Sequence, residues 1–396
     1  MLSNVRKLIL GNGTAQGLQL LSLLVLSRIY RPSDFGVLAQ VQSIATLACI
    51  VATLQLHLTI PLAGTADKAR AAAEIVQSIC LTVFLMSLPV ALYLGKVVTF
   101  SVVLALFLGL ANTYTSYLVA NGSFGRMSKF YITRAVLIIG LQIGFAALSV
   151  PDGLLWAVVM AEGLAALYLR LAHLGPLDTI RLEIGKALEM AARLKSFSLY
   201  GTTQELMSVC AFYAPLLLFT SKFGESTGGH YAMASRLVWA PVILLSGSMA
   251  QVLYHQFGKQ PPTSLGSMYQ PVFGLRVAVG ILATCAAAFG LQNVTLLALG
   301  AQWDLASHML PLHLLWGAAF LLSTPFRVAC RVLHLQKYQL TIDAGMLAAI
   351  WLLFALSAMT PLLTMRALVA IAAVQNALLA VAVWGALNRP AVRLRP

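Results

Sequence analysis

Charged residues are scarce in this sequence. Asp, Glu, Lys and Arg make up 10% of its 396 residues, whereas about 25% is usual in a soluble protein. Acidic residues are the rarer kind, with 12 Asp and Glu against 26 Lys and Arg. Hydrophobic residues fill 60% of the chain, and the mean hydropathy is +0.86. This balance excludes an ordinary soluble domain and predicts an all-α, polytopic membrane protein.

Motifs for catalysis and nucleotide binding are missing as well. The sequence carries no GxSxG, P-loop, HExxH or GxGxxG pattern in a context that fits catalysis or cofactor binding. The longest stretch without a spanning run is 175–199, which is too short for a nucleotide-binding domain. We therefore expect no enzyme activity, no direct use of ATP and no bound cofactor or metal.

Cysteines are few, and they do not form a metal or disulfide pattern. All five fall inside apolar runs, and none belongs to a CxxC pair. Isolated cysteines of this kind behave as small buried apolar residues. The net charge of +14 does not indicate nucleic acid either, because the basic residues lie in short loops rather than in one solvated patch. The cysteines are Cys49, Cys80, Cys210, Cys285 and Cys330.

Long apolar runs are abundant. A membrane-spanning helix needs about 20 mostly apolar residues, and breaks at charges, glycine and proline leave about twelve such runs in the chain. The first run starts behind Arg6 and Lys7 and is too long for the core of a signal peptide. The predicted spans are 8–30, 36–62, 75–95, 97–120, 131–150, 153–174, 199–221, 229–255, 271–299, 309–334, 339–359 and 364–387.

The distribution of Lys and Arg predicts the orientation. With twelve spans, the segments on the side of the N-terminus hold eighteen Lys and Arg residues, and the opposite side holds five. Cytoplasmic loops are enriched in Lys and Arg. We therefore expect both termini to face the cytoplasm.

The middle of the chain resembles its beginning. Gly13-Thr14-Ala15-Gln16 and Phe35-Gly36 recur 188 residues later as Gly201-Thr202-Thr203-Gln204 and Phe223-Gly224. Gly36-Val37-Leu38-Ala39 also resembles the segment that begins at Gly229. These matches predict two parallel six-helix halves, related by an axis along the membrane normal.

A short polar segment separates the two predicted lobes. Residues 177–190 read as an amphipathic helix that would lie along the cytoplasmic interface and tether the lobes. The predicted organisation is an N-terminal lobe over 1–175, an interfacial linker over 176–198 and a C-terminal lobe over 199–396.

Arginines inside the apolar runs are the first candidates for a binding site. Arg236 lies well inside the run that begins at Gly229, where a charge costs roughly 2.5 to 3.5 kcal/mol. Such a residue either pairs with a carboxylate or snorkels to the interface, or it faces a cavity and binds an anionic cargo. Other candidate cavity cations are Arg28, Arg31, Arg276 and Arg327.

Amides and carboxylates inside the runs complete the candidate set. Asn12, Gln16 and Gln19 share one face of the first helix by their spacing. With Gln42 on the second helix, they either bond between helices or form a hydrated, sugar-compatible lining. The carboxylates could pair with arginine or bind a proton or sodium ion. They are Glu162, Glu205 and Asp343. The cations outnumber them, which favours an anionic cargo.

Several segments resemble polysaccharide-biosynthesis membrane proteins. The stretch from Leu26 to Ala39 is similar to the junction of the first two helices in that family, and the segments at 197–201, 229–237 and 336–340 are similar to other parts. The chain therefore resembles the Wzx-type O-antigen flippases of the multidrug/oligosaccharidyl-lipid/polysaccharide exporter superfamily. It departs from the family at Thr364-Met365-Arg366-Ala367, which stands in place of a Gly-rich turn.

The resemblance implies a function and partners. Such proteins have two six-helix lobes around a central cavity, and they move undecaprenyl-pyrophosphate-linked oligosaccharide across the bacterial inner membrane by alternating access. Expected partners are the lipid-linked oligosaccharide, membrane lipids, and polymerase or chain-length machinery, with coupling to H⁺ or Na⁺. Two alternatives stay open: a cation or drug antiporter of the same architecture, and a non-transporting scaffold of a polysaccharide-assembly complex.

Overall fold

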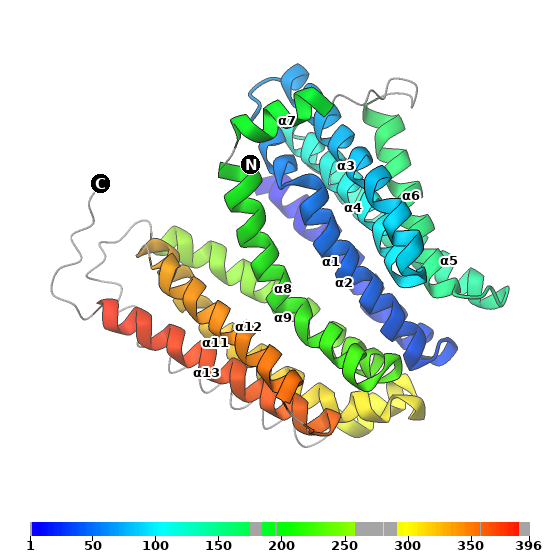
Figure 1. The fold of residues 1–396 in the computed structure, drawn as a ribbon, viewed down its shortest axis with the longest axis vertical. Helices are drawn as coiled ribbons and strands as arrows, with labels where there is room; N and C mark the ends of the chain where they lie inside the picture. The colour runs from blue at the N-terminus through cyan, green and yellow to red at the C-terminus, as the bar shows by residue number, and fades with distance from the viewer. Residues whose placement is uncertain are drawn as a thin grey trace. The chain divides into compact units, whose positions relative to one another are not determined.

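Every regular element that the structure describes is a helix (Figure 1). The structure is a computed structural model, and it describes residues 2–174, 184–194, 196–257, 280, 291–333, 335–356 and 358–387. Within these residues, nine helices are long and apolar enough to cross a membrane. Two more, α1 (Leu2–Ile29) and α9 (Glu225–Phe257), are as long as a span but carry more polar side chains. The predicted all-helical, multi-pass class is confirmed.

The chain divides into two compact units, and each is described here by itself. The N-terminal unit is Met1–Tyr213 and the C-terminal unit is Ala214–Pro396. The division falls inside α8 (Thr202–Phe223), so the predicted lobe boundaries remain a prediction. Besides α1, the N-terminal unit contains α2 (Pro32–Thr53), η1 (Leu56–Leu62), α3 (Ala66–Leu94), α4 (Lys96–Ala120), α5 (Phe124–Ala147), α6 (Gly153–His173), α7 (Ile184–Arg193) and η3 (Ser196–Gly201).

Two helix ends in the N-terminal unit differ from the sequence prediction. The predicted span 36–62 is divided, because Leu54 and Gln55 adopt positive φ angles of 47° and 54° and end α2 before η1. Helix α5 starts at Phe124 rather than at 131. Its first turns are too polar to belong to an apolar run, but their backbone groups form the hydrogen bonds of the helix. As a consequence, Arg134 is the eleventh residue of α5 rather than the fourth residue of a helix that starts at 131.

Small residues let the helices of the N-terminal unit approach closely. Helix α1 packs on α5, and α4 packs on α2, α3 and α6. A Cβ atom at Gly11 would lie only 1.9 Å from the Ser128 hydroxyl, so glycine is required where α1 meets α5. This is a usual device in membranes, where apolar burial drives helix association little and close packing matters more.

The amphipathic helix α7 lies in the N-terminal unit, before η3 and the start of α8. Met190 and the following Leu194 pack against the core between α3, α4 and α6. The first part of the predicted helix, 177–183, lies outside the described residues. The described part is ten residues long, which is too short to cross a membrane.

The C-terminal unit contains the end of α8, then α9, η5 (Ala301–Trp303), α11 (Asp304–Val332), α12 (Gln336–Leu356) and α13 (Pro361–Leu387). Helix α11 packs on both α9 and α13, and α12 packs on α13. Gly317 brings α11 against α9, because a Cβ there would meet Val242 at 2.9 Å and Val238 at 3.1 Å. Most of the predicted span 271–299 lies outside the described residues.

The same packing pairs recur in the two units. In the N-terminal unit the second helix packs on the fourth, and the fourth and fifth pack on the sixth. Helices α9, α11, α12 and α13 repeat these pairs if they are counted as second, fourth, fifth and sixth. Gly36 is the fifth residue of α2, and Gly229 is the fifth residue of α9. This supports the predicted repeat and favours Gly229 over Gly224 as the counterpart of Gly36; their superposition remains a prediction.

Candidate functional site

In the described part of the chain, two groups bring an arginine and a carboxylate from different spanning helices near each other. One is in the N-terminal unit, between α5 and α6. The other is in the C-terminal unit, among α11, α12 and α13. Each contains one arginine and one carboxylate from predicted spans, but their geometries differ.

The N-terminal group is a closed ion pair. Arg134 Nε of α5 donates to Glu162 Oε2 of α6 at 2.7 Å, and a second guanidinium N–H bonds the other carboxylate oxygen. The Glu162 side chain is 3% exposed. A bidentate pair of this kind satisfies both planar groups at once. Of the two interpretations open for Glu162, pairing and ion binding, this geometry favours pairing.

The C-terminal group, called the Arg327 cluster, consists of Ser323, Arg327, Asp343, Gln375 and Asn376. The nearest approach of Arg327 to the Asp343 carboxylate is 4.0 Å. Instead, its Nε donates to the Ser323 hydroxyl at 3.3 Å, and Nη2 donates to Asn376 Oδ1 at 3.4 Å. The Asp343 carboxylate accepts from Gln375 Nε2 at 2.6 Å. The amide, and not the arginine, makes the short contact with this carboxylate.

The carboxylates of the two groups also differ in accessibility. The Asp343 side chain is 33% exposed against 3% for Glu162, whereas the arginines are similarly exposed, at 21% for Arg327 and 28% for Arg134. The guanidinium carbon lies 5.0 Å from the centroid of the Phe320 ring, which supports the cation from one side. A guanidinium held by long contacts to neutral groups can exchange them for an anion.

An aromatic group fixes the helix that carries Arg327. Trp239 of α9 contacts Trp316 and Phe320 of α11 edge-on, with centroids 5.6 Å and 5.4 Å apart. Trp239 and Trp316 are buried. Because Phe320 also lies under Arg327, the packing of α9 on α11 determines where the guanidinium is held.

The other predicted cations lie apart from the Arg327 cluster in the sequence and differ in burial. Arg236 is half-buried in α9, three residues before Trp239. Arg28 and Arg31 are exposed at the turn between α1 and α2, where the Arg31 backbone N–H donates to Asp34 Oδ2 at 2.9 Å. Arg276 lies outside the described residues.

The predicted amides follow one side of α1 and α2. Because α1 is continuous, Asn12, Gln16 and Gln19 do share a face, next to the face that packs on α5. Asn12 is exposed, whereas Gln16, Gln19 and Gln42 are half-buried. These side chains remain candidates for a polar lining.

Sequence reasoning missed three members of the Arg327 cluster. Gln375 and Asn376 are adjacent amides in the apolar run of α13, and Ser323 precedes Arg327 by one turn of α11. Amides inside a spanning run could have indicated them. Glu205, by contrast, is exposed in the first turn of α8.

A family model matches most of the chain. The model for the family described as "Polysaccharide biosynthesis protein" covers residues 25–308. Among curated proteins, no relative matches.

Solved structures of transporters share the fold over nearly the full length. An inward-facing multidrug resistance MATE family transporter of the MOP superfamily has a TM-score of 0.64 and 14% identity, covering 95% of this chain and 96% of its own. The outward-facing form of a MATE family transporter has a TM-score of 0.56 and 15% identity, and the match covers 96% of this chain and 94% of its own. A Pyrococcus furiosus MOP superfamily transporter with a binding pocket of "reverse polarity" has a TM-score of 0.58 and 14% identity. The match covers 98% of this chain and 95% of its own. At these identities the likeness establishes the fold alone.

Proposed function

We propose, from the premise that the chain belongs to the polysaccharide biosynthesis protein family, that it is a flippase for lipid-linked oligosaccharide. The chain is a multi-pass MOP-superfamily transporter, a membrane transport protein rather than a catalyst. The proposed cargo is an undecaprenyl-pyrophosphate-linked repeat unit, such as that of O-antigen or exopolysaccharide. It would cross the bacterial inner membrane by alternating access, with both termini of the protein in the cytoplasm.

The observation that carries this proposal is the loose arrangement of the Arg327 cluster. A pyrophosphate headgroup is anionic and presents oxygens in pairs, which matches the forked donors of arginine. Arg327 contacts neutral acceptors at 3.3 Å and 3.4 Å, and it is closer to them than to Asp343. Exchanging two long neutral contacts for two charged ones favours binding of an anion.

Other cations extend this role along the transport path. Arg236 in the middle part of α9 is proposed to bind the headgroup, with Arg28 and Arg327 as weaker stations nearer the two membrane faces. Arg31 and Arg276 are further candidates of the same kind. Several separated arginines fit a cargo that must be passed on rather than held.

Polar and acidic groups would complete the mechanism. Asn12, Gln16, Gln19 and Gln42 are proposed to contact the glycan through their amides. Protonation of Asp343 would weaken its attraction for Arg327, so this carboxylate is the preferred group for coupling to H⁺ or Na⁺. Glu205 is a weaker candidate, because it lies exposed at the start of α8. Polymerase or chain-length proteins are proposed as neighbours that receive the cargo.

The test is a flipping assay in proteoliposomes that contain defined lipid-linked oligosaccharides. The fraction of glycan protected from an impermeant glycosidase reports translocation. We expect the wild-type chain to translocate the glycan, Arg236→Ala to abolish translocation, and Arg236→Lys to restore it only in part. Membrane abundance, measured in parallel, should stay unchanged.

A second arm separates the alternatives. The same vesicles are loaded with a cationic dye and exposed to a proton or sodium gradient. Gradient-driven dye efflux without glycan translocation would identify a cation antiporter. Neither activity, from protein that is correctly inserted, would favour the scaffold.

A further inference from the structure

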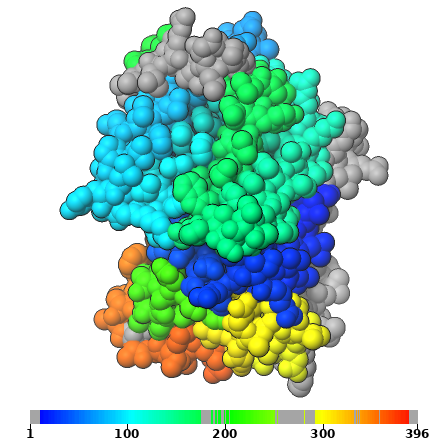
Figure 2. Space-filling model, turned by 90° about the vertical axis from the view of Figure 1, so that its right-hand side faces the viewer, coloured from blue at the N-terminus to red at the C-terminus, as the bar shows by residue number. Residues whose placement is uncertain are grey.

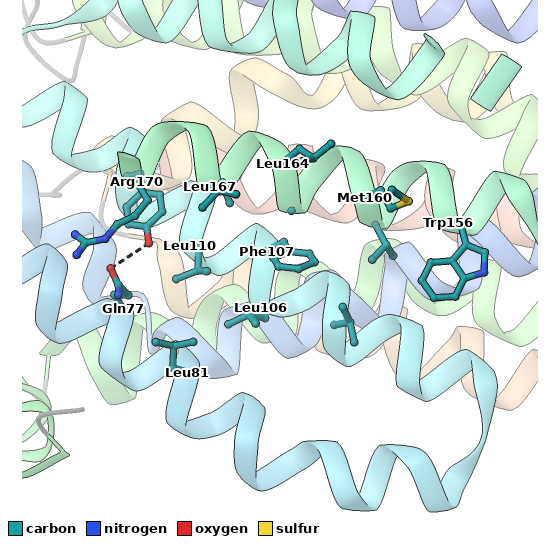
Figure 3. A pocket seen from close by; sticks show the side chains of 15 residues that line it. Gln77, Leu81, Leu106, Phe107, Leu110, Trp156, Met160, Leu164, Leu167 and Arg170 are labelled. Atoms are coloured by element: carbon teal, nitrogen blue, oxygen red, sulfur yellow. Dashed lines mark hydrogen bonds between the residues drawn. The ribbon is translucent and has the colours of Figure 1, made fainter. Parts of the chain in front are cut away.

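A groove of about 600 Å³ runs along α6 in the N-terminal unit, between α6 and helices α3 and α4 (Figure 3). Trp156 lies at one end, and Arg170 and Gln77 lie at the other. The 14 residues between Trp156 and Arg170 span about 21 Å along a helix. This exceeds half of the roughly 30 Å hydrocarbon thickness of a bilayer. Helices α4 and α6 come to the surface beside each other on the face in Figure 2.

The walls of the groove are apolar except at one end. Leu106, Phe107 and Leu110 of α4 form its floor, while Met160 and Leu164 of α6 are partly exposed at its rim. The floor depends on a glycine, because a Cβ at residue 163 would lie 3.0 Å from the Phe107 ring. A dry apolar channel of this shape suits a hydrocarbon chain better than a polar cargo.

The polar end carries concentrated positive charge. Arg70 Nη2 and Arg170 Nη1 both donate to the carbonyl oxygen of Leu174, at 3.0 Å and 3.3 Å. Arg170 is 1% exposed, so its charge lies inside the wall, whereas Arg70 is half-exposed beside Glu74. Next to Arg170, the Tyr114 hydroxyl donates to Gln77 Oε1 at 3.0 Å. Two guanidinium groups against one nearby carboxylate leave this end cationic.

We propose that this groove binds one anionic phospholipid, with an acyl chain along α6 and the phosphate at Arg70 and Arg170. Charge complementarity selects the occupant. An anionic headgroup would meet the half-exposed Arg70, which shares the Leu174 carbonyl with the buried Arg170 at the end of the groove, while the chain extends along α6 towards Trp156. The groove lies wholly within the N-terminal unit. It is separate in sequence from the Arg327 cluster, so this proposal does not rest on the proposed function.

The test uses phosphatidylglycerol with a photoreactive diazirine on one acyl chain. The full-length protein is reconstituted into phosphatidylcholine bilayers with a trace of this probe, irradiated, and mapped by peptide mass spectrometry. We expect labelling to concentrate on groove residues of α4 and α6, and an excess of unlabelled phosphatidylglycerol to reduce it severalfold. Labelling spread evenly over the spanning helices would overturn the proposal, because it would indicate only bulk lipid.

Matched tryptophan variants test the groove itself. Leu164→Trp and Leu167→Trp add bulk at positions that line the groove and are already partly exposed. Each should lower labelling severalfold. Leu171→Trp makes the same change one turn along α6, at an exposed residue outside the lining, and it should leave labelling unchanged. An equal loss in all three variants would contradict the proposal.

Two further arms test the headgroup and the source of the chain. Arg70→Gln should reduce the preference for the phosphatidylglycerol probe over a phosphatidylcholine probe severalfold, while the labelled peptides stay the same. If the wild-type chain were labelled equally by the phosphatidylglycerol and phosphatidylcholine probes, headgroup charge would have no role and the proposal of an anionic lipid would fail. Competition by polyprenyl phosphate, with no competition by phosphatidylglycerol, would assign the groove to a polyprenyl chain and overturn the phospholipid.

Discussion

The two arginine–carboxylate groups show how one pair of residue types can have different roles in a membrane. Arg134 and Glu162 form a bidentate pair whose carboxylate is 3% exposed. Arg327 and Asp343 approach no closer than 4.0 Å, and the carboxylate is 33% exposed. In the first group each partner satisfies the other. In the second, two amides and a hydroxyl make the shorter contacts with the charged groups.

Physical chemistry assigns opposite consequences to these geometries. Removing one member of a buried pair strands a charge, which costs about 3 to 5 kcal/mol. Removing one member of a cluster with neutral partners leaves the remaining groups with contacts. The closed pair therefore belongs to the fold of the N-terminal unit, whereas the Arg327 cluster can change its contacts without unfolding the C-terminal unit.

The largest expected effect follows from Glu162→Ala. This substitution leaves Arg134, whose side chain is 28% exposed, without its carboxylate between α5 and α6, and it should lower the stability by up to about 3 kcal/mol. We expect a marked loss of protein in the membrane and a lower unfolding temperature for what remains. Quantitative blotting of membranes and thermal unfolding in detergent measure both effects.

A compensating variant distinguishes a stranded charge from lost packing. Arg134→Met combined with Glu162→Ala removes both charges, and replacing a buried ion pair by apolar groups is often close to neutral. The double variant should therefore recover much of the abundance. Normal abundance in Glu162→Ala alone would show that the pair does not stabilise the N-terminal unit.

The next effect in size is the loss of translocation in Arg327→Ala, with abundance retained. Charged hydrogen bonds contribute about 1.5 to 3 kcal/mol, so translocation should fall roughly 10- to 150-fold. Asp343 keeps its bond from Gln375 in this variant, which is why stability should change little. Arg327→Lys should restore only part of the activity, because the forked donors are lost.

The flipping assay and membrane abundance, measured on the same preparations, check this prediction. Arg134→Ala is the matched control in the other unit, and it should show the reverse pattern of low abundance. If Arg327→Ala behaves like Arg134→Ala, the distinction between the two groups fails.

A smaller effect is expected when the Arg327 cluster is made more like the closed pair. Gln375→Leu removes the 2.6 Å bond to Asp343 and leaves that carboxylate to turn towards Arg327. A direct ion pair would compete with an anionic cargo at a cost of about 1 kcal/mol, or roughly fivefold in translocation. Adding Asp343→Asn should relieve the competition. Unchanged translocation in Gln375→Leu would show that the amide does not control Arg327.

Much of the fold could be predicted from sequence because apolar length decides where a chain can span. The predicted runs 97–120 and 153–174 match α4 and α6 closely. The end of α2 could not be placed, since Leu54 and Gln55 take positive φ angles without a glycine or proline signal. The start of α5 was missed for a different reason. Backbone hydrogen bonds extend the helix into polar residues beyond the apolar run.

The candidate site was only partly predictable. Depth within an apolar run indicated Arg327 and Glu162, because a charge inside the membrane is costly unless it has a partner or faces a cavity. Their partners depend on how helices turn about their axes, and Asp343 meets Gln375 only because α12 packs on α13 in one register. A single sequence contains no direct record of that rotation. Arg134 shows the same limit, since it lies in the predicted span 131–150 but its pairing with Glu162 of α6 was not predicted.

The smallest effect on stability is expected when the Lys96–Asp152 pair is broken. This pair has short contacts but exposed side chains, so it tests whether contact distance or burial makes an ion pair important. Lys96 Nζ contacts both Asp152 oxygens, at 2.8 Å and 2.9 Å, so on distance alone this pair equals Arg134–Glu162. Its side chains, however, are 54% and 38% exposed. Exposed pairs contribute about 0 to 1 kcal/mol, because water replaces either partner and salt screens the attraction. Lys96→Ala should therefore leave abundance unchanged and shift thermal unfolding only slightly, less so in high salt. A loss as large as that of Glu162→Ala would mean that short contacts, rather than exclusion of water, make an ion pair structural in this protein.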